Sequence, residues 1–151
     1  MRSSLCSSIR ETLEDWIPFS SQETALRDVY LHDISPQRCD RMSVHPGHFT
    51  ASGFIRTWDR KWVLLVFHPH LQKWIQPGGH LESVDKTVFC AAKREIEEET
   101  GLVNVQWDGM MRLDLHQVPQ TSKQMPHQHW DMQFGFEIEK STTLLTGGLH
   151  A

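Results

Sequence analysis

The stretch that decides the fold reads GGHLESVDKTVFCAAKREIEEETGL and runs from Gly78 to Leu102. Its apolar residues recur with helical spacing, which predicts a helix over residues 86–100. Gly101 follows in the position that favours a C-terminal cap. The apolar stripe of this helix consists of Val88, Phe89, Ala92 and Ile96. A helix with one apolar stripe packs that side against a core and leaves the opposite side to charged residues.

Three glutamates share one side of this helix. At about 100° per residue, Glu95, Glu98 and Glu99 fall within roughly a 100° arc of the helix surface. Like charges this close repel one another, and a bound divalent cation removes that cost. Mg²⁺ prefers oxygen ligands, typically one or two carboxylates together with water and phosphate oxygens. The other interpretation of such a run is an ordinary solvated acidic surface.

The loop before the helix supports the metal-site interpretation. Residues 77–79 read Pro-Gly-Gly, and without a Cβ the glycine backbone can approach a ligand and offer a carbonyl to a metal. Arg94 lies four residues before Glu98 and can orient a carboxylate through a two-pronged contact. Asp85 comes just before the helix, where its side chain can cap free N–H groups.

This pattern resembles the signature of the Nudix hydrolase family. That signature is glycine, five residues, glutamate, seven residues and then Arg-Glu-U-x-Glu-Glu-x-Gly-U, where U is a bulky aliphatic residue. Its second half matches here at Arg94, Glu95, Ile96, Glu98, Glu99, Gly101 and Leu102. The first half matches at Gly79, has Asp85 in place of glutamate, and carries one extra residue before Arg94. Both departures lie outside the expected metal ligands.

The resemblance implies an α/β fold class of the Nudix type, an α/β/α sandwich around a mixed sheet. It implies that Glu95, Glu98, Glu99 and the carbonyl of Gly78 hold Mg²⁺ or Mn²⁺. It also implies a nucleotide-type small-molecule substrate, a nucleoside diphosphate linked to another group, whose pyrophosphate is cleaved. Metal ions suit this chemistry because they neutralise phosphate charge and position an attacking water.

Catalysis is expected from Glu95, Glu99 and Arg94. We take Glu95 as the general base because it opens the carboxylate arc, and Glu137 of a later strand is the second choice. The candidates for substrate binding are Gly79, His80, His127 and His129.

The alternation of His127, His129 and Asp131 places all three on one face of a strand. They are either ligands in a cleft or ordinary polar residues of a strand edge. Trp74 is expected to be buried and Cys90 to be a helix-packing thiol.

Outside the signature, the pattern predicts two regions. Residues 1–47 form a helical N-terminal appendage packed on the same domain, with helices over residues 5–16 and 23–32. Residues 48–151 form the Nudix domain. Its strands are expected at residues 48–57, 61–68, 103–107, 110–118 and 129–139.

The C-terminal end departs from the family pattern. The resemblance implies a further strand or helix after Glu139, where residues 140–151 follow. We expect that element to be shortened, supplied by a partner subunit in a homodimer, or replaced by the N-terminal helices.

Composition excludes several classes of protein. A length of 151 residues suits one compact domain, and a net charge of −4 argues against binding to nucleic acid or to an anionic membrane surface. No run of 18 apolar residues predicts a transmembrane helix, and the first residues lack the apolar core of a secretory signal. Three widely spaced cysteines without a CxxC pair fit a reducing, cytoplasmic setting.

Three hypotheses about function result. The first is a metal-dependent pyrophosphohydrolase. The alternative is a Nudix-like module that binds a nucleotide without cleaving it. The third, an isoprenoid diphosphate isomerase, needs a cysteine and an acid facing each other in a pocket, and Cys90 is badly placed for that.

Overall fold

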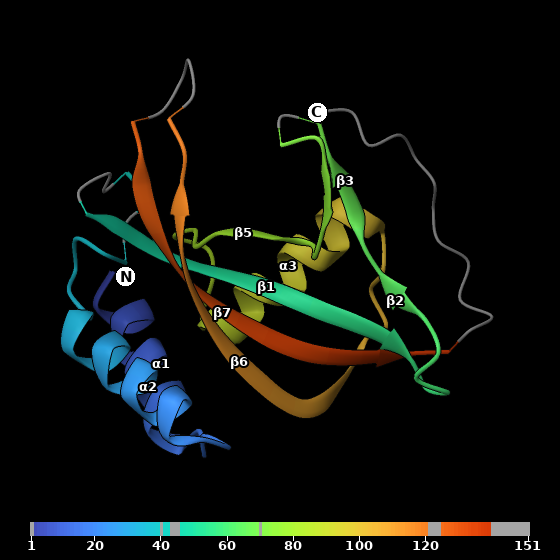
Figure 1. The fold of residues 1–151 in the computed structure, drawn as a ribbon, viewed down its shortest axis with the longest axis horizontal. Helices are drawn as coiled ribbons and strands as arrows, with labels where there is room; N and C mark the ends of the chain where they lie inside the picture. The colour runs from blue at the N-terminus through green and yellow to red at the C-terminus, as the bar shows by residue number, and fades with distance from the viewer. Residues whose placement is uncertain (1, 40, 43–45, 70, 121–124, 140–151) are drawn as a thin grey trace.

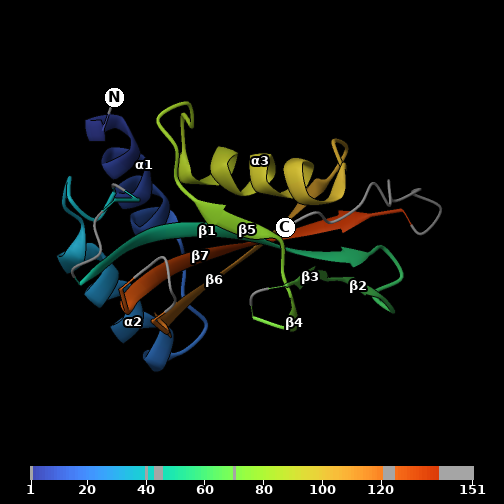
Figure 2. The ribbon, with the colours of Figure 1, turned by 90° about the horizontal axis from the view of Figure 1, so that it is seen from above.

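The computed structural model describes residues 2–39, 41–42, 46–69, 71–120 and 125–139. Two helices come first, α1 (Arg2–Asp15) and α2 (Ser21–Asp33), and a third, α3 (Val88–Thr100), follows several strands. Figure 1 shows α1 and α2 side by side at one end of a long, twisted sheet. Figure 2 shows α3 lying across one face of that sheet.

The sheet is mixed. Its centre is β1 (Gly47–Thr57), which runs parallel to β7 (His127–Ile138), and β7 pairs antiparallel with β6 (Gln106–Val118). Two short strands, β2 (Val63–Leu64) and β5 (Gly78–His80), pair antiparallel with β1. A separate ribbon consists of β3 (Val66–His68) and β4 (Lys73–Ile75). This arrangement of a mixed sheet with helices confirms the predicted α/β fold class.

The two long strands β1 and β7 lie at the centre of the core. Along β1, apolar residues such as Phe49, Ala51 and Ile55 alternate with polar ones, and both sets are buried from residue 47 to residue 53. Side chains alternate between the faces of a strand. One face therefore packs against helices, and the other gathers buried polar groups. The close packing of α3 requires a glycine at Gly53, because a Cβ there would lie 2.4 Å from Cδ1 of Ile96.

The N-terminal helices belong to the same core. Leu5, Ile9 and Leu13 of α1 are buried in the hydrophobic cluster that includes the sheet residues. Tyr30 of α2 is fully buried, and its hydroxyl lies 2.9 Å from the carbonyl of Asp114 and 3.1 Å from that of Asp131. Ser20 caps α2, because its hydroxyl accepts a hydrogen bond from the N–H of Glu23.

Three of the strand predictions are wrong in part. Residues 61–68 form two short strands, because the chain leaves its partner β1 after Leu64 and pairs with β4 from Val66 onward. Residues 103–105 lie outside any strand, and the two strands expected over residues 103–118 are one strand, β6, with an irregularity between Trp107 and Met111. Apolar composition predicts burial at these positions, but pairing depends on where a partner strand lies.

The structure also joins Cys6 and Cys39 in a disulfide. The sequence did not predict this bond, because the chain has three widely spaced cysteines. Among the described residues, no helix is long and apolar enough to cross a membrane. The element expected after Glu139 lies outside the described residues.

Candidate active site

The candidate active site lies where α3 faces the short strand β5. The helix begins after Thr87, whose hydroxyl accepts a hydrogen bond from the N–H of Cys90 at 3.1 Å. Asp85 is therefore not the cap that the sequence predicted. The helix ends at Gly101, as predicted, in the left-handed conformation with φ 72°. The two caps define the start and the end of α3, and so the positions of its glutamates along the helix.

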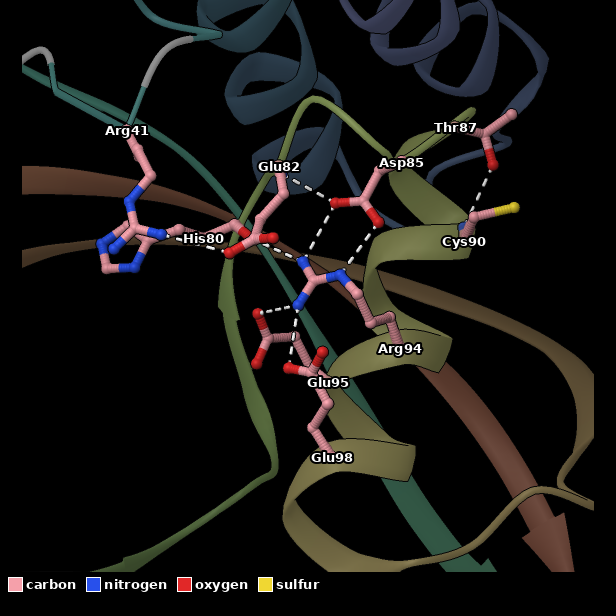
Figure 3. Close-up of polar contacts among 9 residues, drawn as sticks. All are labelled: Arg41, His80, Glu82, Asp85, Thr87, Cys90, Arg94, Glu95 and Glu98. Atoms are coloured by element: carbon pink, nitrogen blue, oxygen red, sulfur yellow. Dashed lines mark hydrogen bonds and ion pairs between the residues drawn. The ribbon is translucent and has the colours of Figure 1, made fainter. Parts of the chain in front are cut away.

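Arg94 connects the loop, the strand and the helix (Figure 3). Its Nε and Nη2 atoms donate to the two carboxylate oxygens of buried Asp85, each at 3.0 Å. Nη1 donates to Glu95 at 2.9 Å and to Glu98 at 3.1 Å. Nη2 also donates to the backbone carbonyl of His80 at 2.9 Å. Asp85 thus has the role of a partner that orients Arg94, and Arg94 in turn orients two of the predicted metal ligands.

The glycines of β5 let two glutamates come close to the strand. A Cβ on Gly79 would lie 2.6 Å from Oε1 of Glu95, so no larger residue fits without moving that carboxylate. The N–H of Gly78 donates to Oε2 of Glu99 at 3.1 Å. Glu98 extends toward solvent, with 57% of its side chain exposed. The structure thus brings the predicted residues of helix and loop together at one site.

The local electrostatics favour a cation at this site. Burial raises the pKa of Glu99 to about 7, and the nearby carboxylates of Glu95 and Glu98 add to the effect. Burial also raises the pKa of Glu95, although the guanidinium of Arg94 opposes the change. A divalent cation among these groups would favour their charged forms and supply the opposite charge that burial makes necessary. The donor set, carboxylates beside an open glycine backbone, fits Mg²⁺ or Mn²⁺.

A second group of titratable residues lies on the opposite side of β5. We call it the histidine cluster, and its members are His48, His80, His116, His127 and His129. The strand register places His129 of β7 beside both His48 of β1 and His116 of β6. The ring of His129 lies 4.9 Å from those of His48 and His127, centre to centre, and about as close to the remaining two at 5.4–5.5 Å.

Two rings in this cluster, those of His80 and His129, are held in their neutral form. Burial, with the neighbouring histidines, lowers the pKa of His129 to about 3 and that of His80 to about 4. The structure confirms that His127 and His129 share a face of one strand, as predicted. His48 was missed as a site residue, although its alternation with Thr50 and Ser52 in β1 was the available signal.

Asp131 shares the face of His127 and His129 but has other partners. Its carboxylate accepts hydrogen bonds from Thr50 at 2.9 Å, from Ser52 at 2.6 Å and from Gln133 at 3.2 Å. Burial raises its pKa, and these three donors oppose that change. Asp131 therefore joins β1 to β7 beneath the cluster.

Three other residues named from the sequence lie in different settings. Glu137 is held by Arg56 at 3.1 Å and by Arg60 at 3.6 Å. Trp74 is 64% exposed and contacts Phe67 across the β3–β4 ribbon, so its predicted burial is wrong.

Cys90 is exposed, so it is not the packing thiol that was expected. It occupies the solvent side of the first turn of α3, next to buried Ala91.

Comparison with known proteins agrees with this geometry. The profile of the NUDIX domain family matches residues 47–148. This chain therefore belongs to the Nudix family, as the sequence predicted, and it is a Nudix-type enzyme. No curated protein sequence matches it.

Solved structures give weaker likenesses. The E. coli dihydroneopterin triphosphate pyrophosphohydrolase is 14% identical with a TM-score of 0.49, over 64% of this chain and 72% of that one. The C. elegans Ap4A hydrolase is 19% identical with a TM-score of 0.46, over 65% of this chain and 74% of that one. The NUDIX domain of Shewanella oneidensis NrtR, solved with ADP ribose, is 19% identical with a TM-score of 0.38, over 63% of this chain and 61% of that one.

Proposed function

We propose that this protein is a Mg²⁺- or Mn²⁺-dependent pyrophosphohydrolase. Its substrate is a nucleoside diphosphate linked to another moiety. The observation that supports the proposal best is the carboxylate cluster of Glu95, Glu98 and Glu99 beside the glycine backbone of β5, with Arg94 fixing two of the three carboxylates. An ordinary solvated acidic surface would need no arginine to hold two of its carboxylates. It would also need no glycine in a neighbouring strand to make room for a carboxylate.

The roles of the residues follow from their contacts. Glu95, Glu98, Glu99 and the carbonyl of Gly78 would hold the metal. Once bound, the metal would neutralise phosphate charge and make a water molecule easier to deprotonate. Arg94 is saturated by protein acceptors, so it positions the ligands and leaves the substrate to other groups.

Glu95 is the proposed general base. Arg94 donates to its Oε1, which leaves Oε2 to receive a proton from the attacking water. The partly buried setting that raises its pKa also makes it a better proton acceptor than an exposed glutamate. Glu137 remains the alternative, and Arg56 and Arg60 both contact its Oε1.

A substrate screen tests this proposal. Purified protein is incubated with Mg²⁺ and a panel of nucleoside triphosphates, dinucleoside polyphosphates, nucleotide sugars and ADP-ribose, and released nucleoside monophosphate is measured. The matched control for Glu99→Gln is Glu97→Gln, because Glu97 lies on the same helix but is exposed on another side. We expect metal-dependent turnover that Glu99→Gln loses and Glu97→Gln keeps. Nucleotide binding without turnover would show a binding module instead.

The cellular setting is part of the proposal. A cytoplasmic location is expected from the sequence, and a homodimer is one of the three arrangements that the sequence leaves open for the C-terminal element. Cytosolic proteins rarely keep disulfides, so thiol alkylation of Cys6 and Cys39 in freshly lysed cells tests the location. Light scattering on the purified protein measures its oligomeric state.

A further inference from the structure

The histidine cluster has a geometry that the proposed hydrolysis does not use. One nitrogen from each of His48, His80 and His129 lies within 4.8 Å of the other two. These three residues come from three different strands, β1, β5 and β7. Two of them, His80 and His129, are partly exposed, so an ion can reach the group, while His48 is 1% exposed and forms its floor.

This cluster is separate from the carboxylate cluster. Side chains alternate between the two sides of a strand. At Gly79 the side-chain direction is toward Glu95, because a Cβ built there would lie 2.6 Å from Oε1 of Glu95. The ring of the next residue, His80, therefore lies on the opposite side of β5. Figure 3 shows this ring directed away from Glu95 and toward Arg41. Arg94 contacts His80 only through the backbone carbonyl.

The spacing of the nitrogens suits a small cation. Ligands about 2.0–2.1 Å from a tetrahedral zinc are roughly 3.3 Å apart. The three nitrogens need to approach one another by no more than about 1.5 Å, which small rotations of the imidazole side chains supply. The strands themselves do not move, because the pairing of His48 with His129 and of Thr50 with His80 fixes the backbone.

His127 supports this geometry independently. Its Nδ1 lies 2.8 Å from the carbonyl of Met125, which can only accept, so Nδ1 carries the proton. Its Nε2 therefore accepts a hydrogen bond from Nε2 of His129, 3.1 Å away, which leaves the lone pair of His129 on its Nδ1. A metal-binding histidine usually donates its other ring N–H to an acceptor, as His129 does here to His127.

The charged groups that the structure describes around the cluster, Asp131, His116 and Arg41, have partners. Asp131 accepts from Thr50, Ser52 and Gln133. His116, the outermost ring, is paired with Asp114 at 2.7 Å. Arg41, near His80, is paired with Glu82 at 3.2 Å. The candidate ligand atoms are thus imidazole nitrogens, which suit Zn²⁺ and similar transition metals better than Mg²⁺.

We propose that His48, His80 and His129 bind a divalent transition-metal cation of the Zn²⁺ type, at a site distinct from the carboxylate cluster. Three protein ligands leave a fourth coordination position open to water or to a phosphate oxygen. His127 positions His129 at this site.

Zinc titration in the presence of saturating Mg²⁺ tests the proposal, because Mg²⁺ prefers carboxylate ligands to imidazoles. Isothermal titration calorimetry on the intact protein should show one Zn²⁺ per chain. The variants His129→Gln and His80→Gln should each weaken Zn²⁺ binding by more than about 100-fold, the upper cost of losing a mere outer-sphere partner. His32→Gln is the control, since His32 is exposed on α2 and paired with Asp33.

A second measurement guards against misfolded variants. Circular dichroism and thermal unfolding without zinc establish that each variant is folded. Zinc should then raise the melting temperature of the wild type and of His32→Gln, but not that of His129→Gln. Co²⁺ should give the visible absorption bands of a tetrahedral site in the wild type, but not in His129→Gln or His80→Gln.

The opposite results would overturn the proposal. They are Zn²⁺ binding that survives in folded His129→Gln and His80→Gln, or zinc binding that Glu99→Gln abolishes. The second result would place zinc at the carboxylate cluster. None of these outcomes depends on hydrolysis, so the histidine site can fail while the proposed enzymatic function stands.

Discussion

Replacing Glu99 with glutamine tests the carboxylate cluster with little change of shape. The amide oxygen can still accept the hydrogen bond that the N–H of Gly78 donates to Glu99, but one negative charge is lost. Removing an outer-sphere partner of a metal ligand costs about 10–100-fold in affinity or activity. Removing the charged ligand itself should therefore lower Mg²⁺-dependent kcat/KM by more than about 100-fold, or about 2.7 kcal/mol of transition-state stabilisation.

The same substitution should have the opposite effect on the metal-free fold. Burial raises the pKa of Glu99 from its ordinary 4.5 to about 7, so the folded chain holds this proton more tightly than the unfolded chain. Stability from this group is full below about pH 4.5 and falls as the pH rises to about 7. Glutamine does not titrate. The difference in free energy of unfolding between Glu99→Gln and the wild type should therefore favour the variant more at pH 8 than at pH 4.

Two assays separate these effects. Released nucleoside monophosphate measures activity, and urea unfolding in EDTA at pH 4 and pH 8 measures stability. Mg²⁺ should raise the melting temperature of the wild type and of Glu97→Gln, and much less that of Glu99→Gln. Wild-type kcat/KM in Glu99→Gln, together with a full Mg²⁺-induced shift in melting temperature, would refute the assignment of Glu99 as a ligand.

Three further substitutions test the rest of the site. Arg94→Lys should lower kcat more than it raises KM, and should lower the free energy of unfolding by about 1–3 kcal/mol, because buried Asp85 loses part of its two-pronged partner; a defect confined to KM would show that Arg94 contacts substrate. Glu95→Gln should lose turnover while calorimetry still detects Mg²⁺, whereas the reverse ranking of Glu95→Gln and Glu137→Gln would identify Glu137 as the base. Gly79→Ala should weaken Mg²⁺ binding in calorimetry, since its Cβ would lie 2.6 Å from Oε1 of Glu95, and unchanged affinity would mean that the carboxylate moves freely.

The sequence by itself determined the Nudix helix and the grouping of its glutamates. Helical spacing is local, so the burial of Val88, Ala92 and Ile96 and the cap at Gly101 could be predicted without knowing the rest of the chain. Alternation along a strand is equally local, and it placed His127 and His129 on one face.

Only the tertiary structure decided which strands lie beside one another. The parallel pairing of β1 with β7 brings His48 to His129 across 81 residues of sequence, and no local pattern specifies that register. The same limit explains the division of residues 61–68 between two sheets, since an apolar run indicates extended backbone but not its hydrogen-bonding partner. The capping role of Thr87 in place of Asp85 follows too, because the competing partner of Asp85, the guanidinium of Arg94, approaches it only in the folded chain.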